Sequence, residues 1–152
     1  MNSVSEKEKG IQSRMVKRLR SDGVLVKERP TLSPPGKLKQ LREAYIPDIV
    51  GIDEDGKVFV VECKTGMFNR PSEGLGRLLL YRRLVRDHFP QFKAQLKEYY
   101  KKEGYEEIAS KARKEKVRYV LALGKARSKA REEFLRKFIG GIRDPKVKLD
   151  FV

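Results

Sequence analysis

One segment, residues 57–64, constrains the fold more than any other part of the sequence. Its apolar residues occupy both sets of alternating positions. They are Val58 and Val60 on one side, and Phe59, Val61 and Cys63 on the other. Successive side chains of a strand point to opposite faces, and a strand that is apolar on both faces belongs inside a sheet covered by helices on both sides. The segment is therefore expected to be a central strand.

The rest of the chain predicts the elements around this strand. Helices are expected over residues 5–22, 75–88, 91–114 and 128–139, a few helical turns over 37–45, loops over 30–36 and 65–74, and strands over 24–26, 46–52, 57–64, 117–123 and 147–152. The charged stretch 91–114, interrupted near Gly104, is expected to be a helical insertion. This order predicts a single α/β domain over residues 1–152, with a mixed β-sheet flanked by helices.

The sequence Asp-Glu-Asp-Gly before Lys57 predicts a tight turn between two strands. If the loop has three residues, 54–56, with its glycine in the left-handed conformation, Asp53 faces Lys57. Asp48 then lies directly opposite Glu62 and on the same face of the sheet. A loop of two or four residues would turn Asp48 to the other face.

Two carboxylates and an ammonium group would then meet at one end of this hairpin. Glu62 and Lys64 are two residues apart on a strand, so they leave the same face as Asp48. Opposed carboxylates repel unless a cation lies between them, and carboxylate oxygens suit Mg²⁺. Such an ion activates water and neutralises charge on phosphoryl oxygens. Lys64 could orient or deprotonate the water, or stabilise developing charge.

The motif consists of Pro-Asp at positions 47 and 48, thirteen further residues, and Glu-Cys-Lys at positions 62–64. This pattern resembles the signature of the PD-(D/E)xK nuclease superfamily, which includes many restriction enzymes, recombination nucleases and archaeal Holliday-junction resolvases. The resemblance implies a restriction-endonuclease-like fold and Mg²⁺- or Mn²⁺-dependent cleavage of DNA. Relatives that cut two strands are often dimers, so it also implies a homodimer.

The resemblance assigns roles to individual residues. Asp48 and Glu62 would bind the metal ion, and Lys64 would assist the water. An acidic residue of the first helix often completes the metal site in this family, and Glu8 is the best match, with Glu6 as the second choice. Glu8 also has the spacing of a capping box with Ser5, so a purely structural role for it stays open.

The helix after the lysine departs from the family pattern. Many members carry a glutamine and a tyrosine four residues apart there. Tyr81 matches the tyrosine, whereas Arg77 stands where the glutamine would be. Arg77 is a candidate contact for phosphate, together with Arg82, Arg83 and Arg86, although the last three would also suit a solvated helix face.

The charge balance also points to a polyanion. The chain carries 36 basic and 21 acidic residues, for a net charge of +15, and residues 66–152 hold +12 of this excess. A thermophilic surface rich in ion pairs would explain many charges but not the imbalance, so nucleic acid, and DNA in particular, is the expected partner.

Two classes of function compete. The first is the metal-dependent deoxyribonuclease, and the second is a nucleic-acid-binding module or subunit that keeps the fold without cutting. The single cysteine, Cys63, excludes a disulfide framework and a cysteine-based structural zinc site within the chain. No apolar stretch has the length of a membrane span, and the polar start predicts a cytoplasmic protein without membrane contact.

Overall fold

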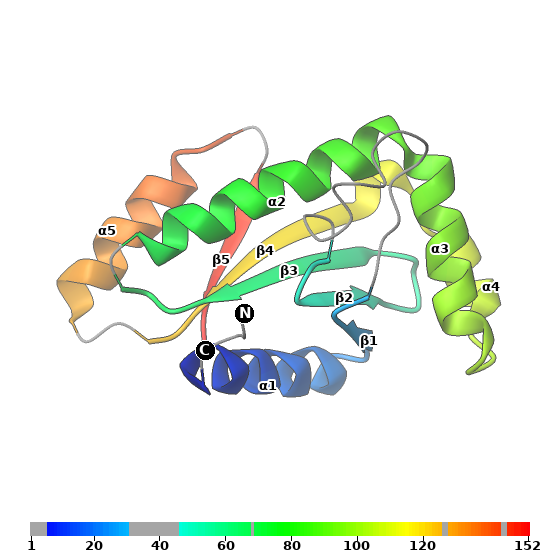
Figure 1. Ribbon diagram of the computed structural model, residues 1–152, viewed down its shortest axis with the longest axis horizontal. Coiled ribbons are helices and arrows are strands. Elements are labelled where there is room, and N and C mark those ends of the chain that lie inside the picture. Colours follow the sequence, from blue (N-terminus) through cyan, green and yellow to red (C-terminus); the bar gives the residue numbers. More distant parts are fainter. Residues whose placement is uncertain (1–5, 31–45, 68, 126–127, 144–145) are drawn as a thin grey trace.

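The computed structural model describes residues 6–30, 46–67, 69–125, 128–143 and 146–152, and it shows a five-stranded mixed sheet flanked by helices (Figure 1). The strands are β1 (Leu25–Glu28), β2 (Ile49–Ile52), β3 (Val58–Lys64), β4 (Val117–Leu123) and β5 (Val147–Phe151). The helices are α1 (Glu6–Ser21), α2 (Arg70–Asp87), α3 (Phe89–Lys101), α4 (Glu106–Ser110) and α5 (Lys129–Gly140), with a short 3₁₀ helix η2 (Lys114–Lys116).

The strands lie in the order β1-β2-β3-β4-β5. The first three are antiparallel, and β3, β4 and β5 are parallel. This confirms the predicted α/β fold with a central mixed sheet, which is the arrangement expected of a restriction-endonuclease-like domain. Among the helices that the structure describes, none combines the length and apolar character needed to cross a bilayer.

Two apolar layers enclose β3, as its sequence predicts. Val58 and Val60 join a core with α2 and α3 on one face of the sheet. Val61 and Cys63 join a second core with α1 on the other face. Figure 1 shows α1 below the sheet and α2 lying across its opposite side. The central strand is thus buried by helices on both faces.

The start of α2 corrects the predicted loop over residues 65–74. The helix begins at Arg70, five residues before the predicted start, and Pro71 lies in its first turn, where a proline has no hydrogen bond to lose. Gly74 is buried, and a Cβ atom there would lie 2.5 Å from Cδ1 of Leu121. The residues that suggested a loop therefore start the helix and let it approach the sheet closely.

The predicted helical insertion contains α3 and α4, separated at Gly104, which has a φ of +81°. One face of α3 packs into the core through Phe92, Leu96 and Tyr100. The Tyr100 hydroxyl donates a hydrogen bond of 2.8 Å to the carbonyl oxygen of Leu25. The predicted turns over residues 37–45 and the capping residue Ser5 lie outside the described residues.

The hairpin between β2 and β3 has the predicted register. Ile49 pairs with Val61, and the amide of Asp53 donates a 3.0 Å hydrogen bond to the carbonyl of Lys57. Gly56 has a φ of +84°, the left-handed conformation that a three-residue loop requires. The same register places Asp48 opposite Glu62, one residue beyond the last paired position of β2.

This loop gives a matched test of the hairpin. Gly56 and Gly104 have nearly the same positive φ, but a Cβ atom at Gly56 would lie 2.6 Å from the carbonyl oxygen of Lys111, whereas one at Gly104 would meet nothing within 4 Å. We expect Gly104→Ala to cost about 1–2 kcal/mol of unfolding free energy, the cost of the left-handed conformation, and Gly56→Ala to cost clearly more. Urea unfolding measures both, and equal losses would contradict the packing described here.

Candidate active site

The site begins where the β2–β3 ladder ends. The Asp48 carbonyl accepts a 2.9 Å hydrogen bond from the amide of Arg29, on the β1 side. Hydrogen-bonded pairs alternate along the ladder, so Pro47 would form the next pair with Cys63, but proline has no N–H to donate to the Cys63 carbonyl. The amide of Cys63 donates to the side chain of Asp48, at 2.7 Å from Oδ2. The proline thus ends the ladder, and the aspartate carboxylate is fixed at that end.

Asp48 and Glu62 occupy a pair position without backbone hydrogen bonds between its members, where opposing side chains lie closest together. Asp48 is 7% exposed and Glu62 is 1% exposed. Burial raises the pKa of Glu62 to about 7, and the negative charge of Asp48 adds to the effect. Burial also raises the pKa of Asp48, against the hydrogen bond from Cys63. The pair therefore resists carrying two negative charges by itself.

Two side chains of α2 contact the carboxylate of Glu62. The hydroxyl of Tyr81 lies 3.1 Å from Oε1 of Glu62 and 2.9 Å from the carbonyl oxygen of Ile46. Arg77, one turn earlier on α2, places its Nε 3.1 Å from the Tyr81 hydroxyl and 3.4 Å from Oε2 of Glu62. Arg77 therefore contacts Glu62 of the acidic pair, and its predicted role as a phosphate contact stays a prediction.

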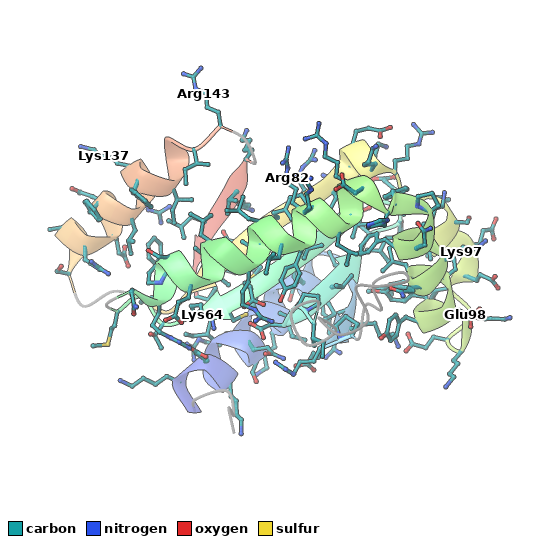
Figure 2. The ribbon with its side chains drawn as sticks, turned by 45° about the horizontal axis from the view of Figure 1, so that its top comes forward. Lys64, Arg82, Lys97, Glu98, Lys137 and Arg143 are labelled. Carbon is teal, nitrogen blue, oxygen red and sulfur yellow. The ribbon has the colours of Figure 1, made fainter. Side chains whose placement is uncertain are left out.

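Lys64 lies at the same end of β3, and its positive charge partly offsets the rise that burial causes in the pKa of both Asp48 and Glu62. Its stem packs against α2 at Gly74, where a Cβ atom would lie 3.0 Å from Cγ of Lys64. Figure 2 shows Lys64 beside the first half of α2. The predicted set of two carboxylates and one lysine is thus gathered at one end of the hairpin.

Arg29 is a member of this site that the sequence did not reveal. It follows β1, and its Nη1 lies 3.3 Å from Oδ1 of Asp48. No local motif marks this residue, because its position depends on the pairing of β1 with β2. The signal in the sequence was limited to a basic residue directly after a predicted strand, and this does not indicate a contact with Asp48.

Glu8 is buried, at 4% exposed, on the helix that covers the other face of the sheet. It is paired with Arg70, whose Nε donates to Oε1 of Glu8 at 3.1 Å. The pKa of the Cys63 thiol is raised, first by burial and then by the negative charges of Asp48, Glu62 and Glu8. All three carboxylates therefore lie near Cys63.

No group of three or more His, Cys, Asp or Glu side chains in the described part of the chain is arranged to hold a metal ion. Asp48 and Glu62 are therefore the pair available to a cation in this arrangement, since Glu8 is engaged by Arg70. The role of Glu8 as a third ligand stays a prediction. The side chain of Glu6, the second choice, lies outside what the structure describes.

The other predicted phosphate contacts on α2 lie in two settings. Arg82 and Arg86 line a hollow of about 760 Å³, together with further basic residues. Arg83 points to solvent and pairs with Asp87 at 2.7 Å. These residues are at the end of α2 away from Lys64, so the structure does not bring them to the acidic pair.

No protein-family model matches the chain, and no curated protein matches its sequence. Among solved structures, the chain is similar to the crystal structure of a repair endonuclease from Pyrococcus abyssi, with 18% sequence identity and a TM-score of 0.43. The similarity covers 100% of this chain and 48% of that one, so the chain spans about half the length of its structural neighbour. A likeness this distant is no guide to activity, and the function rests on the residues of the site.

The raised pKa of Glu62 predicts how stability varies with pH. The unfolded chain loses this proton near its ordinary pKa of 4.5, whereas the folded metal-free protein keeps it up to about pH 7. The unfolded state binds fewer protons over this interval, so the free energy of unfolding falls as pH rises from 4.5 to 7. This group accounts for a loss of about 3 kcal/mol.

We therefore expect Glu62→Gln to change the free energy of unfolding of the metal-free protein more favourably at pH 8 than at pH 4.5. Urea unfolding in the presence of EDTA at the two pH values measures the difference. Glu98→Gln, on the exposed side of α3, is the matched control and should show no such dependence. An equal effect of Glu62→Gln at both pH values would contradict the burial of an ionisable pair.

Proposed function

We propose that the protein is a metal-dependent nuclease that hydrolyses phosphodiester bonds of DNA. One observation carries this proposal: Asp48 and Glu62 are buried opposite one another, beside Lys64, where the strand ladder ends. Burying two neighbouring carboxylates is unfavourable unless protons or cations neutralise them. A domain that needed only stability would be better served by apolar residues at these positions.

The donor set fits a hard divalent cation. Asp48 and Glu62 would hold Mg²⁺ or Mn²⁺ through carboxylate oxygens, the ligands these ions prefer. When bound, such an ion lowers the pKa of a water molecule and neutralises charge on the phosphoryl group. The residues around the pair favour its ionised form, because Arg77, Lys64 and Arg29 all bring positive charge to it.

Each residue then has a task in hydrolysis. The Cys63 amide fixes the Asp48 carboxylate, and the pair of Tyr81 and Arg77 holds that of Glu62. The ammonium of Lys64 donates hydrogen bonds to the attacking water and to the oxygens on which negative charge develops. The water oxygen bonds to phosphorus, and the ester bond to one sugar breaks. One water proton passes to the leaving sugar oxygen, which becomes a hydroxyl, and the other passes to the new phosphomonoester or to solvent.

DNA is the proposed substrate because the chain carries a net charge of +15, which raises the local concentration of polyanions. Two further sequence expectations, the homodimer and the cytoplasmic location, stay predictions. Sedimentation of the purified chain measures the first of these directly.

The proposal predicts cleavage that depends on both carboxylate and lysine. Labelled duplex, single-stranded and branched DNA should be cut with Mn²⁺ or Mg²⁺, and Asp48→Asn and Lys64→Ala should each reduce the rate by at least about 10²-fold. Lys101→Ala removes an exposed charge on α3 and should leave the rate within about twofold of wild type, within the small effect of an exposed charge.

The contrary outcome identifies the competing function. If the wild-type protein leaves all three DNA forms intact with both metals, and binds them with a salt-sensitive affinity that Asp48→Asn does not change, the protein is a binding module rather than a nuclease.

A further inference from the structure

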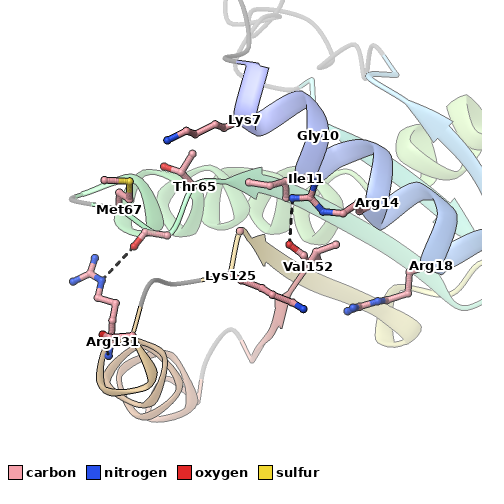
Figure 3. Close-up of a pocket in the computed structure, with 13 residues that line it drawn as sticks. Lys7, Gly10, Ile11, Arg14, Arg18, Thr65, Met67, Lys125, Arg131 and Val152 are labelled. Carbon is pink, nitrogen blue, oxygen red and sulfur yellow. Dashed lines mark hydrogen bonds between the residues drawn. The ribbon is translucent and has the colours of Figure 1, made fainter.

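A basic cavity of about 1000 Å³ lies beyond the carboxyl ends of β3 and β4, between α1 and the start of α5 (Figure 3). Five of the residues that line it have basic side chains and none has an acidic side chain. The five are Lys7, Arg14, Arg18, Lys125 and Arg131. The sequence motif does not include any of them, and they are separate from the basic residues predicted on α2. The cavity therefore holds a concentrated positive charge with no function assigned to it.

Contacts with the backbone hold part of this charge in place. Nη2 of Arg14 lies 3.4 Å from a main-chain oxygen of Val152, and Nε of Arg131 lies 3.2 Å from the carbonyl oxygen of Gly66. Figure 3 shows both contacts at the cavity wall. A neutral carbonyl oxygen, such as that of Gly66, orients a guanidinium without removing its positive charge.

The remaining cations add to the field. Arg18 is 3.9 Å from Asp150, which is not among the lining residues. Lys7 and Lys125 have no hydrogen bond or ion pair with any residue that the structure describes. Lys7, Arg14 and Arg18 recur at intervals of seven and four, so they share one face of α1. This spacing is the signal in the sequence that could have revealed the cavity.

The start of α5 contributes to the same cavity. Ser128 caps the helix by accepting a 3.2 Å hydrogen bond from the amide of Arg131, and both residues line the cavity. The amino end of this helix, which is 12 residues long, carries a partial positive charge that favours anions, phosphates included. Together with five basic side chains, it makes the cavity suited to a group with more than one negative charge.

The cavity adjoins the proposed catalytic residues. Thr65 lines it and directly follows Lys64, so their Cα atoms are about 3.8 Å apart. Its volume is that of a small-molecule site, which admits a single strand or a strand end but not a duplex. Ile11 and Met67 provide apolar surface in the wall for a sugar or a base.

We propose that this cavity binds phosphate groups of the nucleic-acid strand next to the bond that is cut. This inference rests on the proposed nuclease function, because it places the cavity on the path of the substrate strand. The phosphate could come from a strand end, which carries between −1.5 and −2 charges at pH 7 by analogy with phosphorylated side chains, or from internal diesters with about one charge each.

The test compares two pairs of substitutions on the same helix. Lys7→Gln with Arg14→Gln removes two charges from the cavity, and Lys17→Gln with Arg20→Gln removes two exposed charges of α1 that do not line it. A third pair, Lys7→Gln with Lys125→Gln, breaks no described hydrogen bond and guards against a loss caused by misfolding. Circular dichroism checks that all three fold.

Binding is measured without metal, in EDTA, so that no cleavage is needed for the readout. Unlabelled ten-residue oligothymidylates with a 5′-phosphate, a 3′-phosphate or no terminal phosphate compete with a labelled strand for the protein. We expect both cavity pairs to weaken binding at least about tenfold. The slope of log affinity against log salt should fall by about 1.4 for two lost contacts on a single strand. The control pair should change affinity by less than about threefold, since it alters only the net charge.

The outcomes separate the alternatives. A loss confined to strands with a terminal phosphate supports the inference with a strand end as ligand, and an equal loss on all strands supports it with internal phosphates. Equal losses from the cavity and control pairs would overturn it, because net charge alone would explain binding. Absence of cleavage with a cavity-specific loss of binding would count against the nuclease alone, whereas normal cleavage without such a loss would count against the cavity alone.

Discussion

The position of Asp48 depends on the place where the β2–β3 ladder stops. Pro47 has no amide hydrogen to continue the pairing of β2 with β3. Next to it, the Cys63 amide donates a hydrogen bond to the carboxylate of Asp48. This bond fixes Asp48 opposite Glu62 inside the protein. A shift of one residue in the pairing would send the two carboxylates to opposite faces. The turn at Gly56, which sets the register, is therefore part of the site, although it is at the other end of the hairpin.

The buried acidic pair is balanced by cations from three different elements. Arg77 belongs to α2, Lys64 belongs to β3, and Arg29 directly follows β1. In the family that the motif resembles, many members carry a neutral glutamine where this chain has Arg77. A fixed positive charge at that position favours the ionised form of Glu62. The close approach of α2 at Gly74 brings both Arg77 and Tyr81 within reach of the strand.

The sequence predicted the features that depend on local chemistry, and it missed those that depend on tertiary packing. The register of the hairpin followed from the loop length and a glycine with positive φ, and the central place of β3 followed from its two apolar faces. The predicted start of α2 was wrong. Pro71 and Gly74 are typical of loops when read in the sequence alone, and their place in a helix depends on its packing against the sheet. The pairing of Glu8 with Arg70 joins residues 62 positions apart, and no local pattern encodes it.

We propose that Asp48 and Glu62 bind a divalent cation together, and titration calorimetry with Mn²⁺ at pH 6 measures that binding. Glu62, with a pKa of about 7 in the metal-free protein, should lose its proton when the ion binds. The measured heat should then differ between buffers with different ionisation enthalpies, and Glu62→Gln should abolish this difference and weaken binding. No uptake of Mn²⁺, or uptake that is the same in the wild type, Asp48→Asn and Glu62→Gln, would show that the two carboxylates do not bind the ion together.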